Sequence, residues 1–141
     1  MESHAGGCHC GSLQFEFLTA AAPEDMEIRA DQCGFCRRHA ARAVSDPNGR
    51  VIIRVQRQEH LQRYRFGLRT ADFLLCSNCG VYVASAMADG DDLYAIVILN
   101  AFDAAERFTR TPRPVDYDSE DISARRQRRR TRWTPAVLEM A

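Results

Sequence analysis

The chain has 141 residues, of which 45% are hydrophobic and 27% charged, a balance typical of one globular domain with a core of ordinary size. Its 19 basic and 19 acidic residues cancel, which argues against a general binder of nucleic acid or of an anionic membrane. No apolar stretch reaches the length of a membrane span, and the first residues lack a signal-peptide pattern. We therefore expect a cytoplasmic protein, with residues 1–141 as a single domain.

Five segments have the pattern of β-strands. In the first, "LQFEF" at 13–17, apolar and polar residues alternate, as in a strand with one buried face. The other runs are short and rich in β-branched or aromatic residues, and they lie at 51–55, 72–75, 81–86 and 93–99. Turn residues at 88–92 are placed to join the last two as a hairpin. The sequence therefore predicts a mainly β domain with an antiparallel sheet.

Helical segments are predicted to be fewer. Short turns are expected at 58–64 and 103–108, and a longer helix in the C-terminal segment of about 119–141, capped by Ser119 and ending before Pro135. Six arginines lie between 125 and 132. We interpret them as a solvated face that pairs with the acidic residues before it, with phosphate binding as the alternative.

The six cysteines form three short-spaced pairs: Cys8 with Cys10, Cys33 with Cys36, and Cys76 with Cys79. In a reducing compartment such pairs more often hold metal or carry chemistry than form disulfides. Four thiolates from two distant pairs are a common ligand set for a structural zinc ion.

The first and third pairs share a following glycine, Gly11 or Gly80, which permits a positive φ and turns N–H groups toward the sulfurs. In an extended segment, residues 8 and 10 also point to the same side. We predict that one closed zinc site clamps the first strand to the middle of the sheet. Its ligands are Cys8, Cys10, Cys76 and Cys79.

The middle pair, in "DQCGFCRRHA", supplies only two thiolates. A zinc ion bound by Cys33 and Cys36 would need further ligands or keep an open coordination position, where chemistry can take place. Asp31 and His39 are candidate ligands within this stretch. A redox dithiol and a metal-free pair are the alternatives. Of the other histidines, His9 and His60 are expected on the surface and His4 in a mobile tail.

These motifs resemble those of the glutathione-dependent formaldehyde-activating enzyme family, whose domain also occurs in centromere protein V. The similar features are an initial CHCG, a central CGFCRR, a tyrosine about a dozen residues before CSNCG, and a terminal tryptophan. The resemblance covers roughly residues 5–135. It implies an antiparallel β-tent fold, a structural zinc ion on the first and last cysteine pairs, and the joining of formaldehyde to glutathione.

The resemblance also implies a second zinc site, held in the family by a CxCxxC motif. The last two cysteines of that motif match Cys33 and Cys36, and its first cysteine falls on Asp31. A carboxylate in place of a thiolate makes this ligand set harder and more electrophilic.

The residues support three functional hypotheses. The first is a zinc-dependent carbon–sulfur lyase or synthase acting on an adduct of glutathione, or another small thiol, with an aldehyde. Its catalytic residues would be Asp31, Cys33 and Cys36, while Arg37 and Arg38 would bind the carboxylates of the thiol. The second is a non-catalytic zinc module that binds a macromolecular partner through the arginines at 125–132. The third is a redox dithiol protein that uses the same central cysteine pair.

Overall fold

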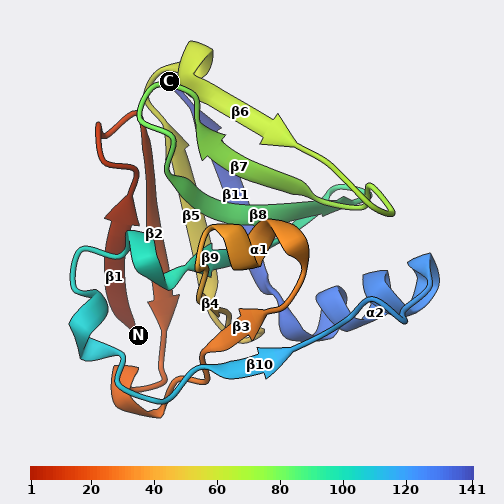
Figure 1. Ribbon diagram of the computed structural model, residues 1–141. Helices are drawn as coiled ribbons and strands as arrows, with labels where there is room; N and C mark the ends of the chain where they lie inside the picture. Colours follow the sequence, from red (N-terminus) through yellow and green to blue (C-terminus); the bar gives the residue numbers. More distant parts are fainter.

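The computed structural model describes residues 1–141 and shows a chain made mainly of short β-strands (Figure 1). The strands are β1 (Glu2–Gly7), β2 (Leu13–Thr19), β3 (Arg29–Asp31), β4 (Ala43–Val44), β5 (Arg50–Val55), β6 (Leu61–Tyr64), β7 (Asp72–Cys76), β8 (Tyr82–Asp89), β9 (Asp92–Ile98), β10 (Arg113–Val115) and β11 (Thr134–Met140). The helices are α1 (Gly34–Arg38) and α2 (Ile122–Arg132), with short 3₁₀ turns η1 (Pro23–Asp25), η2 (Gln58–His60), η3 (Leu99–Ala101) and η4 (Ala105–Arg107). The predicted β class is therefore confirmed.

The strands form two groups that share β11. In the first group β1, β2 and β5 are antiparallel neighbours, and β11 runs parallel to β5. In the second group β9 pairs with β8, which continues to β7 and β6, and on its other side with β4, which continues to β3 and β10. The start of β11 pairs with β9 and the remainder with β5, so this strand joins the groups. Figure 1 shows them inclined to each other like the sides of a tent.

Two of the strand pairs depart from the expected antiparallel order. β11 is parallel to β5, and β10 is parallel to β3. Parallel neighbours require a long connection between them, and in both pairs the partners are far apart in the sequence. The sheet is therefore mixed rather than antiparallel throughout. Local turn signals do not reveal pairing between distant segments, which is why the sequence did not predict it.

The alternating pattern of the first predicted strand corresponds to burial in the core. Leu13, Phe15 and Phe17 are 1%, 2% and 0% exposed, and they pack in one cluster with the buried residues of β5. Burial of each of these side chains contributes about 1.5–3 kcal/mol to folding. This core lies between the inclined groups of strands.

Several segments differ from the sequence-based expectation. Residues 2–7 form β1 rather than a mobile tail, because β2 supplies a pairing partner along their whole length. The segment 58–64 is a short 3₁₀ turn followed by β6, which pairs with β7, rather than a helical segment. At 103–108 the helical segment is limited to η4.

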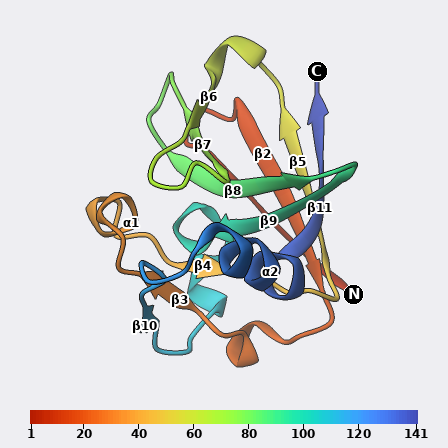
Figure 2. The same cartoon turned by 90° about the vertical axis from the view of Figure 1, so that its right-hand side faces the viewer.

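The C-terminal helix forms, but it begins later than predicted. Asp121 caps α2, since its carboxylate accepts a hydrogen bond from the Ala124 N–H (2.8 Å), and the expectation for Ser119 is wrong. The helix ends at Arg132, before Pro135 as predicted. Figure 2 shows α2 in front of the second group of strands, where Arg126 donates a hydrogen bond to the Ala88 carbonyl of β8 (3.1 Å). No helix of the protein is long and apolar enough to cross a membrane.

Candidate metal centres and the adjoining cavity

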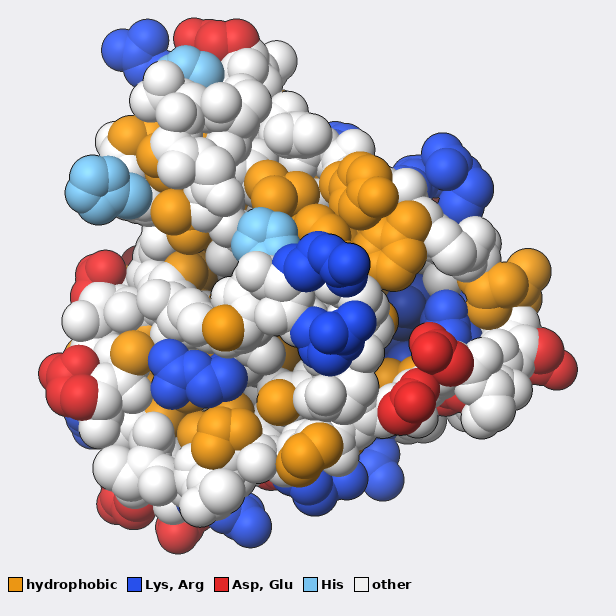
Figure 3. Space-filling model, viewed as in Figure 1, with side chains coloured by type: hydrophobic (Ala, Val, Ile, Leu, Met, Phe, Trp, Pro, Cys, Tyr) orange, Lys and Arg blue, Asp and Glu red, His pale blue; other side chains and the backbone are white.

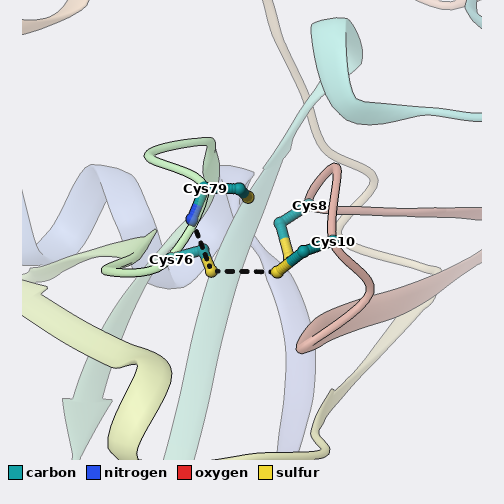
Figure 4. Close-up of side chains that lie close together, drawn as sticks. All are labelled: Cys8, Cys10, Cys76 and Cys79. Carbon is teal, nitrogen blue, oxygen red and sulfur yellow. Dashed lines mark hydrogen bonds between the residues drawn. The ribbon is translucent and has the colours of Figure 1, made fainter.

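Four cysteines from two separate parts of the chain converge in one group (Figure 4). The turn between β1 and β2 carries Cys8 and Cys10, while Cys76 is the last residue of β7 and Cys79 lies in the turn between β7 and β8. Their sulfur atoms all lie within 4.8 Å of one another. The Cys8–Cys10 and Cys10–Cys76 sulfurs are 3.8 and 3.5 Å apart. A tetrahedral site with Zn–S bonds of about 2.3 Å has sulfur–sulfur edges of about 3.8 Å, so these residues fit a zinc ion.

Local backbone geometry positions these sulfurs. Gly11 and Gly80 have φ values of +84° and +83°, as the motif predicts. The Leu13 N–H donates to the Cys8 sulfur (3.3 Å), and the Cys79 N–H donates to the Cys76 sulfur (3.4 Å). Residues 8–12 form a turn rather than the expected extended segment, so the first two sulfurs meet because the chain folds back between two strands.

The environment of this four-cysteine group sets the ionisation of its thiols. Burial raises the pKa of Cys8 to about 12, whereas hydrogen bonding with Asn78 and Ser12 lowers the pKa of Cys10 to about 5. The Ser12 hydroxyl also forms a hydrogen bond with Nδ1 of His60 (2.7 Å), so this half-buried histidine supports the group from outside it. A thiolate already present at neutral pH gives a cation its first ligand, and binding then displaces the remaining protons.

A second group combines a carboxylate with two thiols. Asp31 lies at the end of β3, Cys33 caps the N-terminus of α1, and Cys36 lies within that helix. Their ligand atoms lie within 4.8 Å of one another. The Asp31 carboxylate accepts a hydrogen bond from the Cys33 N–H (2.9 Å), and the Cys33 sulfur accepts one from the Cys36 N–H (3.3 Å). The fold therefore brings together the three residues that the family resemblance aligned.

This Asp–Cys–Cys group has one acidic thiol and only three donors. A hydrogen bond with Cys36 lowers the pKa of Cys33 to about 7, while that bond and burial raise the pKa of Cys36. Zinc accepts carboxylate oxygen and sulfur, so the donor set fits a zinc ion with one position left for another ligand. His39 is outside the group: its exposed ring packs at a tilt of 40° against that of Phe35, with ring centroids 4.5 Å apart.

A cavity of about 50 Å³ adjoins the Asp–Cys–Cys group. Asp31 and Cys36 form part of its wall, and most of the remainder is apolar. Its other polar side chains are Arg29, Tyr82, Ser85, Tyr117, Arg128 and Arg129. An open groove of about 490 Å³ lies next to it and shares Arg29, Tyr117 and Arg128 with the cavity wall.

The arginines expected to contact substrate lie elsewhere. Arg37 and Arg38 are exposed, and they donate hydrogen bonds to the backbone carbonyls of Gln32 (3.3 Å) and Gly34 (3.0 Å). Neither lines the cavity. Figure 3, viewed toward α1, shows arginine side chains on the surface over that helix and in the recess between it and α2.

Sequence reasoning missed Arg128 and Arg129 of the cavity wall because it treated α2 as a uniformly solvated face. Four of its arginines do form ion pairs: Arg125 and Arg128 with Glu120, and Arg126 and Arg130 with Asp89. Arg129 instead is buried, with its guanidinium 4.7 Å from the Trp133 ring. The four-residue spacing between Arg129 and that tryptophan was the available signal, because residues at this spacing share one face of a helix.

The chain is similar to known proteins in both sequence and fold. Residues 3–115 match the family model described as glutathione-dependent formaldehyde-activating enzyme. The chain is also similar to the crystal structure of a Rhodobacter sphaeroides protein, a structural genomics target, with 26% sequence identity and a TM-score of 0.56. That similarity covers 79% of this chain and 99% of the other. The family match includes all six cysteines, whereas α2 and β11 follow its last residue.

Proposed function

The chain belongs to the glutathione-dependent formaldehyde-activating enzyme family, and we propose that it is a zinc-dependent carbon–sulfur lyase or synthase. Its substrate would be the adduct of a small thiol, such as glutathione, with an aldehyde. The observation that carries this proposal is the group of three metal-ligand side chains, Asp31, Cys33 and Cys36, beside a cavity. Asp31 and Cys36 form part of the cavity wall. In this proposal Cys8, Cys10, Cys76 and Cys79 bind a separate, structural zinc ion.

The Asp–Cys–Cys group would hold the catalytic ion. Bound there, zinc would supply a Lewis acid that lowers the pKa of a thiol in the fourth position. The carboxylate of Asp31 is anchored by the Cys33 N–H, so its orientation is set by the start of α1. Cys36 is buried and Cys33 is half-buried, which limits access of water to the two sulfurs.

In this proposal the cavity and the groove bind different parts of the substrate. A cavity of about 50 Å³ cannot contain glutathione, so the body of such a thiol would lie in the outer groove with only its sulfur end reaching inward. Arginine guanidinium groups bind carboxylates in bidentate fashion, and Arg132 in this groove is available to those of a peptide thiol, whereas Arg113 is already paired with Glu27 (2.6 Å). The thiol sulfur would bond to the carbonyl carbon, and the thiol proton would pass to the carbonyl oxygen.

Tyr82 is placed to assist at that oxygen. Its hydroxyl lies 2.5 Å from the Ser85 hydroxyl, and both residues line the cavity. Burial raises the pKa of Tyr82, so its hydroxyl stays protonated and can donate a hydrogen bond to a substrate oxygen. The reverse reaction would break the carbon–sulfur bond and return the proton to sulfur.

Zinc content and turnover test the proposal together. We expect two zinc ions per chain in wild type by elemental analysis and one in Cys33→Ser and Asp31→Ala, with turnover of a thiol–aldehyde adduct lost in both variants. Asp118→Asn, at an exposed position, is the matched control and should retain two ions and full turnover. One zinc ion in all four proteins, together with no turnover, would contradict the proposal.

One observation favours a second candidate, a redox dithiol. The pKa of Cys33, lowered to about 7, makes its thiol reactive at neutral pH. In that case wild type would contain one zinc ion, and Cys33 and Cys36 would convert reversibly to a disulfide in glutathione redox buffers. Binding of a macromolecule through α2 is not favoured, because four of its arginines are paired with carboxylates.

A further inference from the structure

The cavity contains positive charge that the protein does not neutralise. Arg129 is only 7% exposed, and it has no carboxylate partner, although Arg125, Arg126, Arg128 and Arg130 on the same helix each have one. It donates one hydrogen bond, to the Thr70 hydroxyl (2.6 Å), and its buried Nε has no partner. Burial of an unpaired charge is costly, and burial lowers the pKa of this guanidinium to about 10.

A second arginine of the cavity wall is also without an acidic partner. Arg29, half-buried on β3, donates a hydrogen bond to the Ser45 hydroxyl, and no carboxylate lies within ion-pair distance of it. The third arginine of the wall, Arg128, is already bound to Glu120 (2.8 Å). The one acidic side chain in the wall is Asp31, which belongs to the Asp–Cys–Cys group. The cavity thus offers two unpaired cations to an anionic ligand.

The size of the cavity limits that ligand. A single water molecule needs about 10–15 Å³ by the same measure. The cavity of about 50 Å³ therefore holds the equivalent of three to five waters, or a compound of about four or five non-hydrogen atoms. A two-carbon compound made of a carboxylate and an aldehyde group has five non-hydrogen atoms and is therefore of this size.

We propose that the cavity is a carboxylate subsite, in which Arg129 and Arg29 bind the carboxylate of a small substrate whose reacting carbon faces Asp31 and Cys36. This inference rests on the proposed function and extends it: the aldehyde is an oxo acid of two carbons, such as glyoxylate, rather than a neutral aldehyde. A thiol would add to its aldehyde carbon, so that a carbon–sulfur bond forms, the C=O π bond breaks and the thiol proton moves to the oxygen. No oxidant or reductant is needed. A terminal carboxylate of the thiol is the other source of the same group.

The subsite depends on the C-terminal segment of this chain. Arg129 and Trp133 belong to α2 and its end, and both follow residue 115, where the family match stops. Trp133 packs against the Arg129 guanidinium, which holds the cation in place without neutralising it. The selectivity inferred here therefore depends on this segment together with Arg29 of β3, and not on the cysteine motifs.

Calorimetric binding to the zinc-containing protein tests the inference. We expect wild type to bind glyoxylate and formate but not acetaldehyde, and the dissociation constant of glyoxylate to rise about tenfold or more in Arg129→Gln and in Arg29→Gln. Arg130→Gln, on the same helix, removes a surface pair with Asp89 and should bind as wild type does. Arg29→Gln keeps the test valid if Arg129→Gln does not fold.

Competition separates the two sources of the carboxylate. Displacement of formate by glyoxylate alone supports the oxo acid as substrate, whereas displacement by glutathione alone keeps the subsite but overturns the oxo acid. The subsite would be overturned if wild type bound no carboxylate, or if both arginine variants bound glyoxylate as tightly as wild type does. Either result would stand even if a formaldehyde–glutathione adduct turned over normally. Arginine-dependent carboxylate binding without turnover of any thiol–aldehyde adduct would support the subsite and contradict the proposed function instead.

Discussion

His4 is a buried titratable residue outside both cysteine groups. It is 6% exposed, and its ring lies among the aromatic side chains of Phe17, Phe102 and Phe108. Its buried Nε2 has no hydrogen-bond partner, and the nearest carboxylate oxygen, on Glu2, is 3.7 Å away. Burial lowers the pKa of this imidazole, although Glu2 acts in the opposite direction. The folded protein therefore favours neutral His4.

This preference predicts a loss of stability in mild acid. An unfolded chain protonates histidine near pH 6.5, whereas folded His4 protonates at lower pH, so stability falls as the pH drops through about 6.5. We expect the unfolding free energy, measured by urea denaturation at about pH 7.5 and 5.5, to fall more in wild type than in His4→Leu. Metal released in acid would lower the unfolding free energy of both proteins alike, so its effect cancels when the loss in His4→Leu is subtracted from the loss in wild type. Equal losses would mean that His4 is solvated.

Which residues the sequence could predict depends on how local their signals are. The positive φ values of Gly11 and Gly80 follow from a short motif, and the structure has them. The environment of His4 depends instead on aromatic side chains contributed by other segments, and Arg129 is buried among cavity residues that other segments contribute, so neither burial follows from the adjacent residues alone. The cavity arginines were missed for this reason, whereas the Asp–Cys–Cys group was found.

At the scale of elements, α2 shows how competing local signals decide a boundary. Both Ser119 and Asp121 are good capping residues. The Asp121 carboxylate reaches the Ala124 N–H, while Glu120, between the two, pairs with Arg125 and Arg128. Composition predicts the helix, and side-chain geometry selects its first residue. Similarly, 58–64 includes β6 because β7 offers a partner, which the segment itself does not indicate.

The helix boundary can be tested with two alanine variants. We expect Asp121→Ala to lower the unfolding free energy by about 1 kcal/mol, because the Ala124 N–H loses its acceptor. Ser119→Ala, its matched control, should change the unfolding free energy by less than about 0.5 kcal/mol. Chemical denaturation followed by circular dichroism measures both. A larger loss for Ser119→Ala would mean that α2 begins two residues earlier in solution.

At the scale of the whole molecule, two features connect the inclined groups of strands. β11 pairs with both β5 and β9, which joins the groups along one line. The four-cysteine group joins the β1–β2 turn of the first group of strands to the β7–β8 connection of the second group. Neither β1 nor β2 pairs with β7 or β8. Cysteine spacing predicted this second connection, because a shared ligand set requires proximity. The parallel pairing of β11 has no such marker in the sequence.

This architecture predicts that the two cysteine groups contribute unequally to stability. Structural zinc contributes roughly 10–16 kcal/mol to the folding of small zinc domains, so loss of one ligand in Cys76→Ser should lower the unfolding free energy by more than about 3 kcal/mol. Cys33→Ser should change it by less than about 1 kcal/mol, because serine can also cap α1 and this group ties no strands together. Fluorescence of Trp133, the single tryptophan and a buried one, reports unfolding in urea. A chelator should reproduce the effect of Cys76→Ser in wild type. Equal losses in the two variants would show that the connection between the strand groups does not depend on the four-cysteine site.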